Sequence, residues 1–146
     1  MMLTILNNQK GVFFDQVLFK KAVELILDKL KVSGKEITIS FVSAPMMRKL
    51  NKEYRKKDYV TDVLSFPMGD EIFTEVLGDI IICPRKARVQ ADEIGNTLDE
   101  EMAFLAIHGI LHLIGHDHEE PAEEAIMLAK QQELKDYLSG KLGLWR

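Results

Sequence analysis

The sequence HGILHLIGHDH, residues 108–118, contains all four histidines of the chain. His108 and His112 are four residues apart, so on a helix they would lie one turn apart on the same face. The glycine three residues later favours the left-handed conformation that commonly ends a helix. A sharp turn there would bring His116 or His118 back toward the same point. The stretch therefore predicts the end of a helix and a cluster of three imidazoles.

Three imidazoles around one point predict a catalytic metal site. Zn²⁺ binds such nitrogens at about 2.0–2.1 Å, and a site with three protein ligands keeps an open position for water. Structural zinc sites usually close with four ligands, mostly cysteines, and Cys83 is the only cysteine. We therefore expect one zinc ion per chain, which would make its water acidic and polarise a carbonyl or phosphoryl oxygen.

Two alternatives to this chemistry can be weighed from the same residues. Histidines that only pack would leave a half-charged helix face desolvated, without a metal bond to offset the free-energy cost. Zinc peptidases of the H-E-x-x-H type carry a glutamate as general base after the first ligand. This chain has Gly109 there, so peptide hydrolysis by that mechanism is disfavoured.

The histidines are expected near the end of a long helix over 97–115, with Thr97 and Glu100 as a capping box and Gly115 as the stop. Strands are predicted at 3–6, 36–43, 63–68 and 78–83, and further helices at 16–31, 45–55, 84–95 and 121–138. This order predicts an α+β (mixed α/β) fold: a small mixed sheet of about four strands covered by helices, with the three-histidine site at the end of the long central helix. We expect residues 1–146 to form a single metallo-hydrolase-like domain.

The composition is that of an ordinary globular protein, with 47% hydrophobic and 29% charged residues. One cysteine excludes an intramolecular disulfide and suits a reducing compartment. The N-terminus lacks the features of a signal peptide. The longest mostly apolar run, MAFLAIHGILHLIG, is too short and too polar to span a bilayer. A cytoplasmic location away from membranes is expected.

Charge is distributed unevenly along the chain, although the net charge is only −4. Residues 48–57 carry six basic side chains and one acid, whereas residues 99–124 carry eight acids and no lysine or arginine. Arg48, Lys52 and Arg55 are spaced to share one helix face, which could follow a phosphate backbone. Arg55 could hold a phosphate through two hydrogen bonds. The alternative is a solvated basic helix without a ligand.

Several other residues are weaker candidates. His116 could act as a general acid or base, or lie exposed in a loop. Asp117 could hydrogen-bond a ligating imidazole or form an Asx-turn, and Asp79 could support a ligand or end a strand. Three residues of TDVLSF could bind substrate or equally cap turns: Thr61, Asp62 and Ser65.

The histidine stretch fits the pattern H-G-x-L-H-L-x-G-x-D-H, which resembles the signature of the YbeY family of bacterial endoribonucleases. LNKEYRKKDYVTDVLSFPM at 50–68 resembles the family's other characteristic block, and GDIIIC at 78–83 its strand before the histidine helix. The resemblance extends over nearly the whole chain. It implies a mixed sheet with helices and a zinc ion held by three histidines.

The resemblance also assigns roles that spacing leaves open. It implies His108, His112 and His118 as the zinc ligands, and so selects His118 over His116. It implicates Arg55 in activity. The roles that it implies are processing of the small-subunit rRNA 3′ end and ribosome quality control. The partners that it implies are ribosomal RNA and the small ribosomal subunit. Our hypothesis is a zinc-dependent single-strand endoribonuclease of rRNA maturation, with Arg55 and His112 as catalytic residues.

Two other functions compete with this hypothesis. A metal-stabilised ribosome-assembly factor would bind RNA or protein without turnover, and the missing glutamate favours it. A zinc hydrolase of small molecules or peptides would use the same ligands on another substrate.

Overall fold

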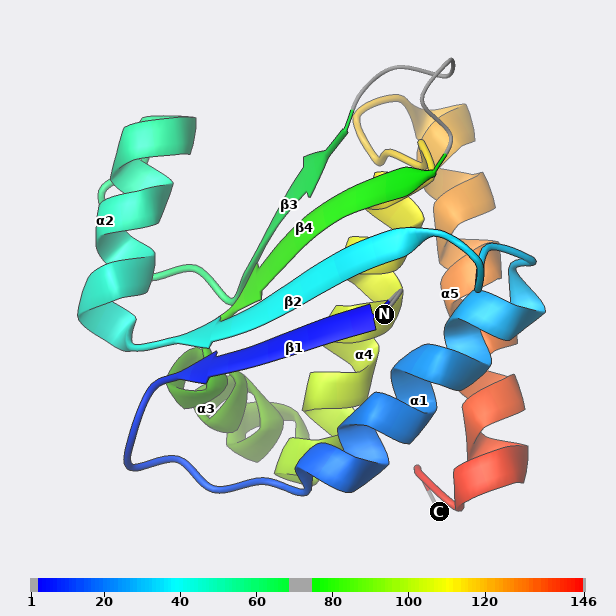
Figure 1. The fold of residues 1–146 in the computed structure, drawn as a ribbon, viewed down its shortest axis with the longest axis horizontal. Coiled ribbons are helices and arrows are strands. Elements are labelled where there is room, and N and C mark those ends of the chain that lie inside the picture. Colours follow the sequence, from blue (N-terminus) through cyan, green and yellow to red (C-terminus); the bar gives the residue numbers. More distant parts are fainter. Residues whose placement is uncertain (1–2, 69–74, 146) are drawn as a thin grey trace.

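The protein contains a mixed four-stranded sheet in the part of the chain that the computed structural model describes, residues 3–68 and 75–145. The strand order is β1-β2-β4-β3 (Figure 1). The parallel strands are β1 (Leu3–Asn8), β2 (Glu36–Val42) and β4 (Val76–Ile82), whereas β3 (Val63–Pro67) is antiparallel to β4. β3 therefore forms one edge of the sheet.

Five helices accompany this sheet in the described residues: α1 (Gln16–Lys29), α2 (Ala44–Arg55), α3 (Pro84–Ile94), α4 (Leu98–Leu113) and α5 (Pro121–Leu142). The predicted α+β class, and every helix and strand predicted from the sequence, is confirmed. The last helix is longer than expected. It continues from residue 138 to Leu142 and ends at Gly143, which has a left-handed φ of 73°.

The main core lies between one face of the sheet and α4. Ile39 of β2 and Ile80 of β4 are register partners, and both are fully buried. Side chains alternate between the faces of a strand, so residues two positions away, such as Ile37 and Ile82, face the same core. α1, α3 and α5 pack around α4, which explains why hydrophobic residues occur on all its sides.

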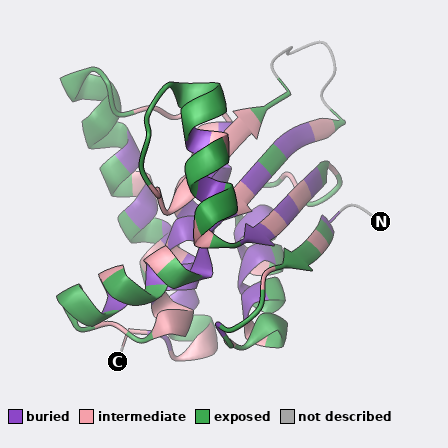
Figure 2. Ribbon diagram, turned by 90° about the vertical axis from the view of Figure 1, so that its left-hand side faces the viewer, coloured by how far each residue is buried: buried purple, intermediate pink, exposed green. Residues whose placement is uncertain are grey.

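The opposite face of the sheet carries α2. Met47 of α2 packs with Leu64 of β3 in a second, smaller cluster, and Tyr54 meets Phe66 edge to face at 5.3 Å. Met47 and Asn51 are the buried residues of α2. The outward surface of this helix is exposed (Figure 2). α2 and α4 therefore lie on the two sides of β3.

A local signal sets the N-terminal end of α4. The Thr97 side chain accepts a hydrogen bond from the Glu100 N–H, and the Glu100 carboxylate accepts one from the Thr97 N–H, as in a capping box.

The described helices include none with the length and apolar character that a membrane span requires.

Candidate metal centre and its cavity

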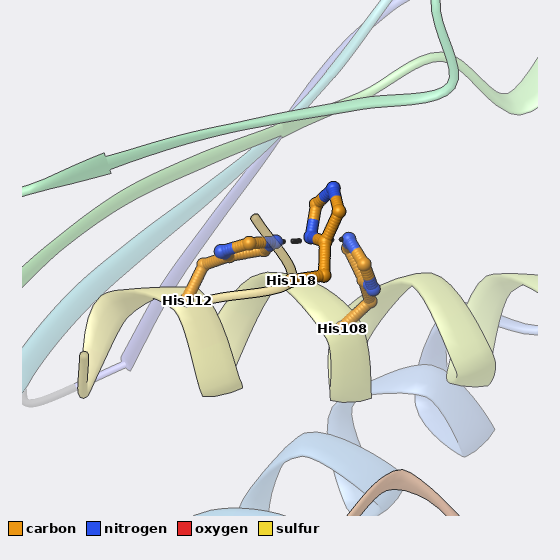
Figure 3. A group of neighbouring side chains, drawn as sticks. All are labelled: His108, His112 and His118. Carbon is orange, nitrogen blue, oxygen red and sulfur yellow. Dashed lines mark hydrogen bonds between the residues drawn. The ribbon is translucent and has the colours of Figure 1, made fainter. Parts of the chain in front are cut away.

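Three histidines converge at the C-terminal end of α4. One ring nitrogen from each of His108, His112 and His118 lies within 4.8 Å of the other two. The Nε2 atoms of His108 and His112 are 3.0 Å apart, and the His118 ring stands over this pair (Figure 3). Two ligands come from consecutive turns of one helix, and the third comes from the loop that follows.

The turn after α4 brings His118 back to the helix. Gly115 has φ 101°, and its N–H donates to the carbonyl of His112 at 3.1 Å. The N–H of His116 donates to the carbonyl of Leu111 at 3.0 Å. These two bonds form a Schellman motif, in which the residue after the helix takes the left-handed conformation that glycine adopts at least cost. The predicted helix stop is confirmed.

The arrangement fits a tetrahedral zinc ion. Ligand distances of about 2.0–2.1 Å place neighbouring nitrogens about 3.3 Å apart. The separation of 3.0 Å between His108 and His112 is close to this value. The side chain of His118 is 57% exposed, so its ring can rotate to complete the site. Among the described residues the group consists of three nitrogen donors, and a site with three protein ligands is typical of a catalytic rather than a structural metal.

The two helical histidines favour the neutral form that binds a metal. Burial lowers the pKa of His108, and this effect outweighs the opposing influences of the Gln131 side chain and of the charge on Asp62. Burial also lowers the pKa of His112, and the neighbouring His108 lowers it further. Near neutral pH both rings therefore present an unprotonated nitrogen without a large cost of deprotonation.

The glycine between these ligands leaves no room for a general base at its position. A Cβ on Gly109 would lie 2.9 Å from Cδ1 and 3.1 Å from Cγ2 of Ile80. Gly109 thus faces the sheet and lets α4 approach β4 closely. A glutamate there, as in the zinc peptidases, would push the helix away from the strand.

The histidines open into a cavity of about 500 Å³ beside β3. Its walls come from α2 and the loop after it, from β3, and from the end of α4. The polar and charged residues of the lining are Asn51, Arg55, Lys57, Tyr59, Thr61, Asp62, Ser65, His108, His112, His116, Asp117, His118 and Glu119. The basic residues of the lining, Arg55 and Lys57, come from the end of α2 and the loop after it. Asp117 and Glu119 come from the same loop as His118.

Comparison with known proteins agrees with this arrangement. The family model described as "Endoribonuclease YbeY" matches residues 4–139. The chain belongs to the YbeY family. A relative of that name from Carboxydothermus hydrogenoformans is 43% identical over 136 residues, which is 91% of this chain and 94% of its own length. One from Aquifex aeolicus is 44% identical and covers 84% of this chain and 81% of its own length.

A solved structure of similar fold extends the comparison. A protein from Thermotoga maritima, solved in solution, superposes on 96% of this chain and 91% of its own with a TM-score of 0.69 and 33% identity. The resemblance that the histidine motif and the two upstream blocks indicated is therefore confirmed at the level of the YbeY family.

The predicted basic face of α2 is divided by the fold. Arg55, at the C-terminal end of α2, lines the histidine cavity together with Lys57. Arg48 instead forms an ion pair with Asp58, at 2.7 Å between Nε and Oδ1, and Lys52 lies 4.0 Å from the same carboxylate. Arg48 and Lys52 line grooves outside the cavity. Of the three basic candidates, only Arg55 is brought to the histidines.

The acidic candidates are also separated. Asp117 lines the cavity, and its Oδ1 accepts the N–H of His118 at 2.7 Å. Asp79 does not line it. Its neighbours Gly78 and Ile80 face α4, so the alternation of β4 directs Asp79 to the other, exposed face of the sheet. Of the two roles considered for Asp79, support of a histidine is therefore not favoured, because its side chain lies outside the cavity.

The candidates of TDVLSF lie together at the cavity but are partly occupied by structural bonds. Asp62 accepts the N–H of Val63 at 2.8 Å and the side-chain amide of Gln90 at 3.0 Å. The Ser65 hydroxyl donates to the carbonyl of Gly109 at 3.4 Å, and so ties β3 to α4. Thr61 and His116 also line the cavity.

Three further residues at or behind the cavity were not anticipated from the sequence. Tyr59 lines it and is 52% exposed. Asn51 is buried, and its amide donates to the carbonyl of Tyr59 at 2.9 Å, which anchors the loop after α2. Gln131 of α5 is buried, and its side chain counteracts the lowering of the His108 pKa by burial. For Gln131, a signal existed: it is a polar residue at helical spacing among the apolar residues of 121–138.

Proposed function

We propose that this chain is a metal-dependent endoribonuclease that cleaves single-stranded RNA in rRNA maturation. The observation that carries the proposal is the single cavity that holds three converging histidines opposite the basic residues Arg55 and Lys57. A phosphodiester is the substrate group that needs both features, because it is anionic and is attacked at a phosphoryl centre.

We propose zinc as the metal and His108, His112 and His118 as its ligands, one ion per chain. Neutral imidazoles at these separations suit Zn²⁺, although such donors also bind cobalt, nickel and copper. When bound, zinc would lower the pKa of a water molecule and polarise a phosphoryl oxygen.

The chain's own groups would position and neutralise the substrate. Arg55 makes no ion pair within 4.0 Å in the described part of the chain, and neither does Lys57. Both cations are therefore free to meet a phosphate, and the guanidinium can do so through two hydrogen bonds. His116 is a candidate for proton transfer to the leaving oxygen, because it lines the same cavity as the ligands.

We further propose that the substrate is ribosomal RNA near the 3′ end of the small-subunit rRNA, and that the protein acts in the cytoplasm in contact with the small ribosomal subunit. The name of the relatives, Endoribonuclease YbeY, supports an RNA substrate. The rRNA site and the ribosomal partner rest on the family resemblance.

One observation favours a second candidate, a metal-stabilised assembly factor without turnover. Two of the three carboxylates that line the cavity are occupied: Asp62 accepts three hydrogen bonds and Asp117 accepts the N–H of His118. Neither carboxylate is free to act as a general base without breaking a structural contact.

Metal analysis and RNA cleavage, measured on the same samples, separate these functions. Wild type and His112→Ala are analysed for metal and incubated with an rRNA 3′-end fragment. His116→Ala is the matched control for metal content alone, since it removes an imidazole from the same cavity outside the three-histidine cluster. We expect about one zinc per chain in wild type and His116→Ala, and loss of both zinc and cleavage in His112→Ala.

Other outcomes decide against the proposal. Cleavage that persists in His112→Ala after metal loss would contradict a metal-dependent nuclease. Zinc that is lost in His112→Ala, with no cleavage by wild type alone or with small ribosomal subunits added, would favour the non-catalytic assembly factor.

A further inference from the structure

The outward face of α2 carries lysines that the proposed site does not use. Met47 and Asn51 are the buried residues of this helix. With about 3.6 residues per turn, Lys49 and Lys52 lie on the side opposite to them, and Lys56 follows at the end of the helix. All three lysines are exposed. We call this group the lysine ridge: Lys49, Lys52 and Lys56.

The positive charge of the ridge is poorly compensated. In the described part of the chain, Lys49 and Lys56 form no ion pair within 4.0 Å, and Lys52 lies 4.0 Å from Asp58. Asp58 is itself held by Arg48 at 2.7 Å. Like charges three or four residues apart repel one another on a helix. The helix dipole favours cations in the last turn, but Lys49 lies in the middle of α2. An anionic ligand would relieve this repulsion.

Lys56 occupies a backbone conformation that favours glycine. Its φ is 60°. Its N–H donates to the carbonyl of Lys52 at 3.1 Å, and the N–H of Lys57 donates to that of Asn51 at 3.3 Å. A side chain at such a left-handed position costs free energy that glycine avoids. The Lys56 ammonium donates to the carbonyl of Glu53 at 3.4 Å, a long bond that a phosphate oxygen can replace. The ammonium is therefore the reason to look for a role at this position.

Two open grooves are lined by the ridge. Lys49 and Lys52 line both grooves, which have volumes of about 600 and 590 Å³, and Lys56 lines the second. The chain neighbours of Lys56, Arg55 and Lys57, line the histidine cavity. Positive charge is therefore continuous from the cavity, over the end of α2, to the outward face of this helix.

We propose that the lysine ridge binds the phosphate backbone of an RNA strand outside the cavity in which that strand is cleaved. The proposal rests on the proposed function and adds a second contact surface to it. Lysine ammonium groups bind phosphates as point charges, so this surface would hold RNA without reading its sequence. The chain has a net charge of −4, and residues 99–124 carry eight acids. A basic surface beside the cavity would guide a polyanion to the histidines against this charge.

The salt dependence of RNA binding tests the ridge. The full chain, with a chelator present to prevent cleavage, binds a fluorescent single-stranded oligoribonucleotide of about twelve nucleotides. The ridge variant replaces its three lysines by glutamine. The control variant does the same at three exposed lysines of α1 and its C-terminal end: Lys20, Lys21 and Lys31.

Both variants lose the same charge, so only the position differs. Each phosphate contact that is lost should reduce the slope of log Kd against log salt by about 0.7 for a single strand. We therefore expect the ridge variant to lose about 2 from this slope. Its Kd should rise about tenfold, since exposed charge contacts are individually weak. The control variant should keep the slope of wild type.

A glycine substitution separates binding from folding at one position. Lys31 shares the left-handed conformation of Lys56, with φ 61°, and is exposed after α1. The end of α1 and the start of α2 lie at opposite ends of β2 (Figure 1). Lys56→Gly and Lys31→Gly should both melt at or above the temperature of wild type. Only Lys56→Gly should lose about 0.7 from the salt slope. A lower melting temperature with unchanged RNA binding would show that Lys56 only caps α2.

Three further outcomes would overturn the proposal. They are an unchanged salt slope in the ridge variant, an equal loss in the control variant, and tighter binding of poly-glutamate than of RNA with the same dependence on the lysines. The last would assign the ridge to an acidic protein partner. Failure of the proposed function looks different. RNA binding that depends on the ridge, without cleavage by any zinc-loaded variant, would keep this surface and remove the nuclease.

Discussion

At the residue scale, the chemistry of the site depends on which charged side chains are already held in ion pairs. Arg55 and Arg48 lie on the same helix with the same charge, but Asp58 pairs with Arg48 at 2.7 Å and Arg55 lines the histidine cavity. An exposed ion pair contributes little to stability. The difference between the two arginines therefore concerns function more than folding.

Arg55 can be tested against Arg48 directly. We expect Arg55→Gln to lower kcat/KM for RNA cleavage about 10–100-fold, because a hydrogen bond to a charged group is worth about 1.5–3 kcal/mol. Arg55→Lys should recover only part of the loss, since lysine lacks the planar fork. Arg48→Gln should change kcat/KM by no more than about threefold. Equal losses in Arg48→Gln and Arg55→Gln would contradict a specific role for Arg55.

The buried carboxyl of Glu101 predicts a pH dependence of stability. Glu101 is 3% exposed, and burial raises its pKa in the folded state despite a hydrogen bond from Gln90. The folded protein then binds this proton more tightly than the unfolded chain. Its ionisation consequently destabilises the fold as pH rises from the unfolded pKa, about 4.3, through the raised folded value.

Urea unfolding of metal-free Glu101→Gln and wild type from pH 4 to pH 7 checks this. The stability of the variant relative to wild type should increase with pH across that window. Glu93→Gln, on the exposed side of α3, is the matched control. A difference between Glu101→Gln and wild type that stays constant with pH would contradict the prediction.

At the element scale, two glycines let segments approach closely around the site. Gly109 brings α4 against Ile80 of β4, and Gly78 brings β4 against β3. A Cβ on Gly78 would lie 2.2 Å from the backbone oxygen of Phe66, and its φ is 137°. Neither feature was predicted, because the sequence shows glycine without showing what lies opposite it.

Gly78→Ala should therefore destabilise the protein by at least about 2 kcal/mol, through backbone strain and the clash with β3. Gly34→Ala is the control, since no heavy atom lies within 4 Å of a Cβ there. We expect it to change stability by less than about 1 kcal/mol. Both are measured by urea unfolding. A Gly78→Ala variant as stable as Gly34→Ala would show that β3 can shift at little cost.

At the scale of the whole molecule, the proposed metal site joins segments far apart in the chain. The three histidines come from α4 and its following loop, and the basic wall comes from the end of α2 and the loop after it. A metal bound only by the folded protein stabilises the entire fold. The organisation of residues 1–146 as one domain remains a prediction, and the same experiment bears on it.

Zinc at a free concentration 100 times its Kd should add about 2.7 kcal/mol to the free energy of unfolding. For a chain of this size, that corresponds to a rise in Tm of about 5–10 °C. Scanning calorimetry of metal-free protein, with and without zinc, measures the rise, and a single shifted transition is expected for one domain. His112→Ala should show little shift. A rise of similar size in His112→Ala would contradict zinc binding at the three histidines.

Local sequence signals were enough to predict the helices, the strands and the centre of the site. The spacing of His108 and His112, the capping box at Thr97 and the Gly115 stop are local signals, because helix geometry and helix ends depend on residues a few positions apart. For that reason the order of helices and strands was predicted correctly, and so was the convergence of the imidazoles. The family pattern, rather than spacing, selected His118 for the third position.

The other residues around this centre are set by the packing of distant segments and could not be predicted from local signals. This packing separated Arg55 from Arg48 and turned Asp79 to the far face of the sheet. These outcomes depend on which face of a strand or helix packs against a distant segment, and on which charge finds a partner there. Such contacts join residues separated by tens of positions, so periodicity and composition carry little information about them.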